Sequence, residues 1–72
     1  MEQLKVGDKI RITNMFRNFV VEIERVTKTQ AISKPYNDAG SRYRFHIGYT
    51  NKEYLRVIGM GKWNTTNYKL II

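Results

Sequence analysis

The stretch that decides the fold reads Arg42-Tyr43-Arg44-Phe45-His46-Ile47. In it, a tyrosine, a phenylalanine and an isoleucine alternate with two arginines and a histidine. Because successive side chains of a β-strand point to opposite faces, this pattern predicts a strand with one apolar and one cationic face. We expect the apolar face to join the core and the cationic face to be open to solvent.

A second strand is expected to pair with this one. The stretch Val26-Thr27-Lys28-Thr29-Gln30-Ala31-Ile32 is rich in β-branched residues and carries a lysine. Residues 34–41, which lie between the two, contain proline, Asn-Asp and glycine, and these are typical of chain reversal. The sequence therefore predicts a hairpin of residues 26–32 and 42–47 whose outer side is a basic platform.

Two segments before this hairpin also fit strands. Polar and apolar residues alternate in Lys9-Ile10-Arg11-Ile12-Thr13, which follows the turn signal Gly7-Asp8. Alternation resumes from Phe19 to Glu24 and slips at Arg25-Val26. A β-bulge near Glu24 and Arg25 restores the pattern and predicts a bend that lets one long strand serve two halves of a small barrel.

The segments after the hairpin are less regular. The run Gly48-Tyr49-Thr50-Asn51-Lys52 is typical of a turn. Residues 53–58 fit either a strand or a short helix, because Thr50 and Glu53 have capping-box spacing while tyrosine, valine and isoleucine favour a strand. The run Tyr68-Lys69-Leu70-Ile71-Ile72 alternates well enough to close the sheet as its last strand.

A resemblance to known proteins points to a small barrel. The run Val6-Gly7-Asp8-Lys9-Ile10-Arg11-Ile12 resembles the start of SH3-like small barrels, KOW-type modules in particular, in which a similar run leads into the first strand. Residues 25–31, 42–45 and 68–70 together resemble short bacteriophage proteins. The first resemblance implies a fold and the second a source, and neither implies an activity.

The chain is therefore expected to form one all-β domain over residues 1–72. Its form is predicted to be a small five- to six-stranded SH3-like barrel or a highly curved antiparallel sheet. A chain of 72 residues buries only a small core. It has no cysteine, which excludes disulfides and thiolate metal sites.

Charge is the strongest functional signal in the sequence. The net charge is +7, from 13 basic and 6 acidic side chains, and the sequence pI is near 10.0. Residues 1–24 carry four basic and four acidic side chains, whereas residues 25–72 carry nine basic and two acidic ones. All of the excess charge lies in the later two-thirds, and such a domain attracts polyanions, of which nucleic acid is the commonest in a cytosol.

No feature of the sequence favours a membrane protein or a secreted one. No apolar run approaches the roughly 18 residues that a membrane helix needs. The first residues, Met1-Glu2-Gln3-Leu4-Lys5, lack the apolar centre of a signal peptide. We expect a cytoplasmic protein, located in the host cell cytoplasm if a phage encodes it.

Enzymatic chemistry finds little support. His46 is the single histidine, there is no cysteine, and the six acids are scattered along the chain. No glycine-rich phosphate loop is present, because Gly59-Met60-Gly61-Lys62 is too short and wrongly spaced. We therefore predict no enzyme activity, no catalytic residues, no metal site and no cofactor.

Basic side chains in loops and on the expected platform are the candidate phosphate contacts. Arg25 and Arg56 are further candidate cations that are not among the predicted binding residues. The predicted nucleic-acid-binding residues are Arg17, Lys28, Lys34, Arg42, Arg44, Lys52 and Lys62. Rings in loops or beside glycines suit stacking on bases or anchoring of a partner. These are Phe16, Tyr36, Tyr49 and Trp63.

Structural roles for the same residues stay open. Phe16 or Phe19, at or beside the loop of residues 14–18, could fold back as a lid over the core. Trp63 could be a core residue, and Arg42 and Arg44 could form an ordinary solvated strand face.

Two function classes follow, with a third beside them. The first is a non-enzymatic module that binds DNA or RNA by its phosphate backbone with weak sequence preference. The second is a protein-interaction module, such as a phage factor that docks on or inhibits a host protein through Met15, Phe16 and Trp63. The third is a virion or assembly component that forms oligomers through the edge of the last strand, which ends at Ile71-Ile72.

Overall fold

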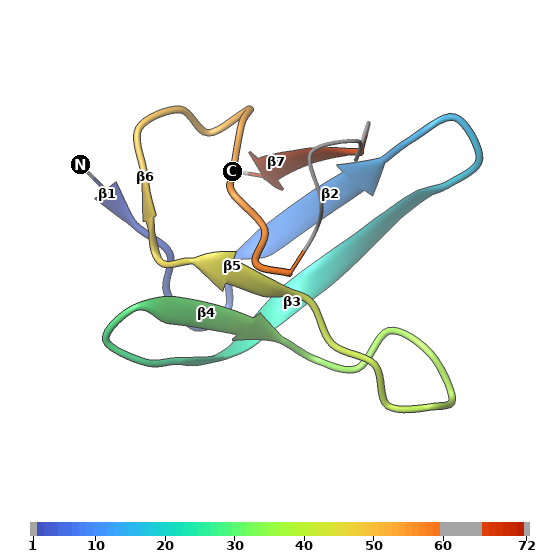
Figure 1. Ribbon diagram of the computed structural model, residues 1–72, viewed down its shortest axis with the longest axis horizontal. Coiled ribbons are helices and arrows are strands. Elements are labelled where there is room, and N and C mark those ends of the chain that lie inside the picture. Colours follow the sequence, from blue (N-terminus) through green and yellow to red (C-terminus); the bar gives the residue numbers. More distant parts are fainter. Residues whose placement is uncertain (1, 60–65, 72) are drawn as a thin grey trace.

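Two antiparallel sheets make up the regular structure of residues 2–59 and 66–71, which are the residues that the computed structural model describes (Figure 1). The strands are β1 (Glu2–Gln3), β2 (Lys9–Thr13), β3 (Asn18–Val26), β4 (Gln30–Ser33), β5 (Arg44–His46), β6 (Gly48–Tyr49) and β7 (Asn67–Ile71). The described residues form no helix, and hence none long and apolar enough to span a membrane. The predicted all-β class is confirmed.

The larger sheet has the strand order β5-β4-β3-β2-β7, and β1 and β6 form a small second sheet. Strands β2 to β5 follow one another as a meander, and β7 returns to lie against the free side of β2. The five strands curl through 223°, so the sheet forms a half-barrel (Figure 1). The predicted highly curved antiparallel sheet is therefore what the chain forms.

A β-bulge in β3 divides the half-barrel into its two parts. The first half of β3 pairs with β2, and Ile23 and the residues after it pair with β4. The register shifts between Ile23 and Arg25, so Glu24 is the extra residue, as the slip in alternation predicted. The bend at a bulge lets one strand belong to both parts of a curled sheet.

Phe45 lies at the centre of the core. Its side chain is fully buried, its strand neighbours are Ala31 and Val57, and its ring lies 5.6 Å from that of Tyr68. On either side of it in the chain, Arg44 and His46 are exposed, so the alternation predicted for residues 42–47 is confirmed. The core cluster comprises Leu4, Ile10, Ile12, Val21, Ile23, Ala31, Phe45, Leu55, Tyr68 and Leu70.

The predicted hairpin is confirmed in its pairing and corrected in its limits. Gln30, Ala31 and Ile32 pair with residues 44–46, but residues 27–29 form a tight turn rather than the start of β4. The cause is Thr27, whose backbone N–H donates to the Gln30 carbonyl at 2.8 Å and whose hydroxyl accepts the Gln30 N–H at 3.1 Å. A side chain that satisfies its own backbone in this way favours a turn over a strand.

Residues 48–58 also differ from the prediction. Gly48 and Tyr49 form β6, which pairs with β1, whereas a turn was predicted here. Residues 53–58 form neither a helix nor a regular strand, and Val57 makes only an isolated bridge to Phe45. The segment instead divides its backbone hydrogen bonds between β7 and β5, with Leu55 N–H donating to the Tyr68 carbonyl at 3.1 Å.

This arrangement also covers one strand edge that was predicted to be open. The free side of β7 receives residues 52–55, because Leu70 N–H donates to the Lys52 carbonyl at 2.7 Å. The edge next to Ile71 is therefore partly satisfied within the chain, which weakens the route to oligomers through the last strand.

Ser33 closes the base of the loop formed by residues 34–43. It is the buried polar residue of the described chain, with 0% of its surface exposed. Its hydroxyl accepts the Tyr43 N–H at 2.9 Å and donates to the Lys34 carbonyl at 2.9 Å, while its own N–H donates to the Tyr43 carbonyl at 2.9 Å. Both ends of the loop are thus tied to one side chain.

Replacement of Ser33 by alanine should lower the free energy of unfolding by about 1–3 kcal/mol, because the Tyr43 N–H and the Lys34 carbonyl lose their partner inside the protein. Urea unfolding followed by circular dichroism measures the change. The control is Ser41→Ala, in the same loop, which should change stability by less than about 0.5 kcal/mol. Equal effects of the two substitutions would contradict the role given to Ser33.

Candidate nucleic-acid interface

The strand register places arginines from distant parts of the chain on one face of the sheet. Arg25 pairs with Ile32, and Ile32 pairs with Arg44. Directly paired residues of antiparallel strands share a face. Because the next pair, Ala31 with Phe45, faces the core, these arginines must face outward.

A third arginine joins this face from the segment after β5. Phe45 bridges to Val57, and the His46 N–H donates to the Arg56 carbonyl at 2.8 Å. Arg56 therefore lies beside His46, on the side opposite to Phe45. We call Arg25, Arg44 and Arg56 together the outer arginine face.

No carboxylate forms an ion pair with these three guanidinium groups among the described residues. Arg44 makes one weak contact, from Nη1 to Oε1 of Gln30 at 3.5 Å. All three residues are exposed. Their charges are therefore available to an anionic ligand.

A buried isoleucine lies under this face. Ile32 is only 2% exposed, yet it points away from the core cluster, to which it does not belong. Its paired neighbours are Arg25 and Arg44, so their aliphatic stems are placed to cover it, as arginine stems commonly cover apolar surface. Both arginines are nevertheless exposed, so their charged ends can reach solvent.

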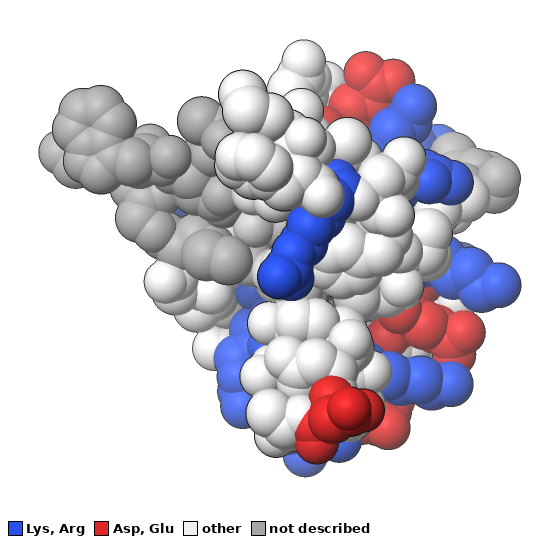
Figure 2. Space-filling view, turned by 90° about the vertical axis from the view of Figure 1, so that its right-hand side faces the viewer, with Lys and Arg blue, Asp and Glu red and all other residues white. Residues whose placement is uncertain are grey.

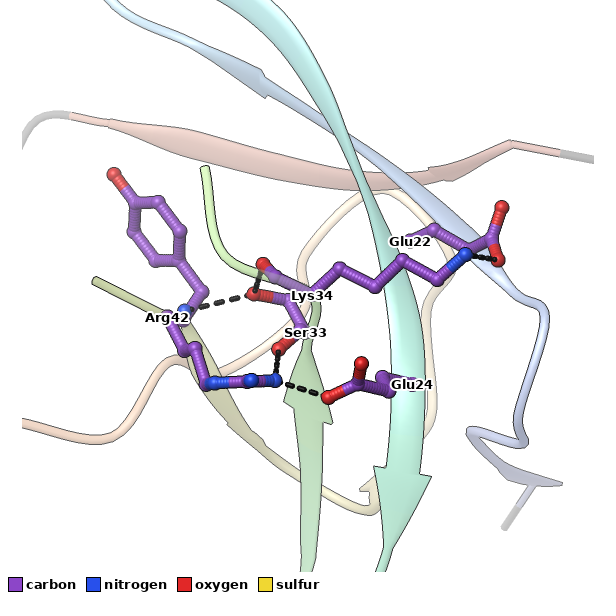
Figure 3. A network of polar contacts seen from close by, with 6 residues as sticks. Glu22, Glu24, Ser33, Lys34 and Arg42 are labelled. Carbon is purple, nitrogen blue, oxygen red and sulfur yellow. Dashed lines mark hydrogen bonds and ion pairs between the residues drawn. The ribbon is translucent and has the colours of Figure 1, made fainter. Parts of the chain in front are cut away.

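Two of the predicted phosphate contacts are instead paired with carboxylates (Figure 3). Lys34 Nζ lies 2.8 Å from Glu22 Oε2. Arg42 Nη1 forms an ion pair with Glu24 Oε2 and donates to the Ser33 carbonyl at 3.1 Å. The prediction that Arg42 lies free on a basic platform is wrong, and Lys34, predicted as a free loop cation, is paired as well. Ile23 pairs with Ser33, which places Glu22 beside Lys34, and the bulge after Ile23 brings Glu24 close to Arg42.

The Glu22–Lys34 pair changes the acidity of both groups. The hydrogen bond from Lys34, and then its charge, lower the pKa of Glu22. The hydrogen bond to Glu22 and the negative charge on it raise the pKa of Lys34. Both side chains lie at the surface, where ion pairs contribute little to stability.

The other predicted cations are spread over the molecule. Lys28 is exposed in the turn between β3 and β4, which adjoins the outer arginine face at Arg25. Arg17 lies in the turn between β2 and β3, and Lys52 lies in the turn after β6. Lys62 and Trp63 lie outside the described residues.

The predicted rings occupy three different environments. Phe16 is 88% exposed in the turn of residues 14–17. Tyr36 is 37% exposed, and its ring lies 4.8 Å from that of Tyr43. Tyr49 is half-buried in β6, where its hydroxyl donates to Glu2 at 2.8 Å, and this hydrogen bond raises the pKa of the tyrosine.

The end of the half-barrel that carries the 14–17 turn and the 34–43 loop is not uniformly basic. Figure 2 shows this end as a largely uncharged surface with a basic side chain lying across it. Basic and acidic side chains alternate along the right-hand margin of that view. Continuous positive charge is therefore not a property of this end of the molecule.

Arg25 and Arg56 were among the predicted cations, but they were not predicted to share one surface with Arg44. The predicted bulge is the feature from which the outward position of Arg25 could have been derived, because a bulge reverses the face of the residues after Glu24. No comparable signal exists for Arg56, because its position depends on the single bridge of Val57 to Phe45.

The described residues hold no group of three or more histidine and acidic side chains that could bind a metal ion. Comparison of the chain with protein-family models, with curated proteins and with solved structures gives no match. The function is therefore argued from the arrangement of charge and aromatic rings alone.

Replacement of Lys34 by methionine should raise the pKa of Glu22 toward its ordinary value, because the hydrogen bond and the charge that lower it are removed. Carbon-13 shifts of the carboxyl group, followed against pH, measure this change. The control is Lys28→Met, which removes the same charge from a turn and should leave the pKa of Glu22 where it was. An equal change in both variants would mean that net charge, not the pair, sets this pKa.

The same pair predicts the pH dependence of stability. Because the pKa of Glu22 is lowered on folding, its contribution is present above the unfolded pKa and is lost as the pH falls through the folded pKa. Because the pKa of Lys34 is raised, its contribution is present below the unfolded pKa and is lost as the pH rises through the folded one. As the pH falls through the range in which Glu22 becomes protonated, the free energy of unfolding should decrease less for Lys34→Met than for the unaltered protein. Urea unfolding at several pH values measures this difference.

Proposed function

We propose that this protein is a non-enzymatic nucleic-acid-binding module that contacts the phosphate backbone with the outer arginine face. The observation that carries the proposal is the alignment of Arg25, Arg44 and Arg56 on one side of the sheet without carboxylate partners in the described chain. Guanidinium groups bind phosphate oxygens with two parallel hydrogen bonds, which suits them to this contact.

The spacing of the arginines supports the same use. Arg25 and Arg44 lie two strands apart, which corresponds to roughly 10 Å between their backbones. Lys28, in the adjoining turn, can extend the row of cations. Several spaced cations on one surface are what a polyanion needs, whereas a single small anion would need a closed pocket.

The strand order is compatible with a small SH3-like barrel, the fold that the KOW-like run of residues 6–12 implies. A meander whose last strand returns to the first, with one bent strand shared between two halves, is the layout described above. Such barrels carry many functions, so the fold supports a binding module without choosing the ligand. A bacteriophage source and a cytoplasmic location stay predictions.

A protein-interaction module is the second candidate, and one observation favours it. Met15 and Phe16 are each 88% exposed, side by side at the tip of a turn. Asn14 fixes that turn, because its side-chain oxygen accepts the N–H groups of Phe16 at 2.8 Å and Arg17 at 2.7 Å. Exposed apolar side chains held in this way can anchor a partner protein.

Replacement of Arg25, Arg44 and Arg56 by serine, singly and together, tests the nucleic-acid proposal. Each substitution should weaken binding to a labelled oligonucleotide and reduce the slope of log K against log salt by about 0.7–0.9, because one phosphate contact is lost. Fluorescence anisotropy at several salt concentrations measures both quantities. The triple variant should lose most of the slope.

The matched control is Arg11→Ser, which removes the same charge from β2, where Arg11 donates to Asn18 at 2.9 Å. It should leave the salt slope nearly unchanged. If Arg11→Ser weakens binding as much as Arg44→Ser, the binding depends on net charge and not on the outer arginine face. Affinity that does not respond to salt would overturn the proposal.

A further inference from the structure

Aromatic rings form a continuous cluster from the core to the end of the half-barrel. Phe45 and Tyr68 are its buried members, and Tyr43 lies about 6 Å from each of them, at 6.1 Å and 6.0 Å. Outside Tyr43 lie Phe19, with its ring 6.1 Å away, and Tyr36, 4.8 Å away. The cluster therefore ends in rings that are only partly buried.

The outer rings of this cluster are held in place. Tyr36 contacts both Tyr43 and Phe19, with the second ring 5.9 Å away. Its backbone N–H donates to the Ser41 carbonyl at 2.9 Å, which ties the main chain that carries the ring to the other side of the 34–43 loop. A ring that is already ordered loses little conformational entropy when a ligand stacks on it.

A cation lies close to these rings in the chain. Arg17 is exposed in the 14–17 turn, two residues before Phe19, whose ring belongs to the cluster. No carboxylate forms an ion pair with Arg17 among the described residues. Exposed rings and a cation at one end of the domain offer contacts for flat bases and for a phosphate.

The aromatic end and the outer arginine face adjoin each other. Residues 42–44 connect them, because Tyr43 points inward into the ring cluster while Arg44, next to it, points outward. In Figure 1 the 34–43 loop and the 14–17 turn extend from the same end of the half-barrel. A ligand that touches both surfaces must curve around this end within a domain of 30 × 25 × 24 Å.

This geometry discriminates between forms of nucleic acid. A duplex stays nearly straight over this distance, with a persistence length of about 50 nm, and its base faces are stacked on one another. A single strand can curve, and the faces of its bases are free to stack on side chains. The two adjoining surfaces together therefore suit a single strand.

We propose that the end formed by Phe19, Tyr36, Tyr43 and Arg17 stacks unpaired bases, so that the ligand of this protein is single-stranded nucleic acid. The inference rests on the proposed function, because the outer arginine face supplies the contacts to the phosphate backbone. Tyr36 is the ring most open to a base, with 37% of its surface exposed.

The test compares an oligo-dT of about twelve nucleotides with the oligo-dT–oligo-dA duplex of the same length, a size within the range of small single-strand sites. The unaltered protein should bind the single strand more tightly. Tyr36→Ala should weaken single-strand binding by about 5- to 150-fold, the effect of one lost stacked base, and leave duplex binding unchanged. Tyr36→Phe should keep the affinity, because it keeps the ring.

The matched control is Tyr54→Ala, which removes another exposed ring, 68% exposed, from a turn outside the cluster. It should not change binding to either oligonucleotide. Proton NMR of the unaltered protein gives a second readout that requires no variant. The ring protons of Tyr36 and Phe19 should shift when oligo-dT is added.

The outcomes separate this inference from the function on which it rests. If duplex and single strand bind alike, with the arginine-dependent salt slope, and Tyr36→Ala changes neither, the inference is wrong and the proposed function stands. If neither oligonucleotide binds at about 50 mM salt, both are wrong. If a proline-rich peptide shifts the Tyr36 ring protons and oligo-dT does not, this end binds proteins and the inference is overturned.

Discussion

The inward placement of Phe45 is the constraint on which the rest of the structure depends. Its side chain is fully buried between the neighbouring strand positions Ala31 and Val57. Because a strand alternates, fixing this one ring inward turns Arg44 outward on one side of the sheet and Tyr43 into the ring cluster on the other. Both surfaces that we assign to ligand binding therefore follow from the burial of one phenylalanine.

The bulge at Glu24 decides how charge is distributed over the outer side. It brings Glu24 within reach of Arg42, although the two are 18 residues apart in the chain, and it places Arg25 next to Ile32. The same irregularity thus pairs Arg42, a predicted phosphate contact, with a glutamate and places Arg25 on the outer arginine face. Both ion pairs lie between β3 and the loop after β4, and their main consequence is that Lys34 and Arg42 are neutralised.

The ring cluster and the outer arginine face are separated by one thickness of sheet in this molecule. Alternation along residues 42–44 places them on opposite sides, and the loop that Ser33 closes carries Tyr36 to the end where the two sides meet. A flexible strand with exposed bases can use both surfaces at once, whereas a stiff duplex reaches only one. The preference for single strands that we propose would therefore follow from shape, and charge alone would not produce it.

The sequence by itself determined the strand class, the alternation of residues 42–47, the bulge at Glu24 and the turn at Gly7-Asp8. Each of these depends on backbone geometry within a few residues, which a local pattern records. Only the tertiary structure decided that β4 starts after the Thr27 turn, that Arg42 and Lys34 each form an ion pair with a glutamate, and that Arg56 lies beside His46. These features depend on register between strands that are distant in the chain, and a one-residue slip in register moves every side chain to the other face.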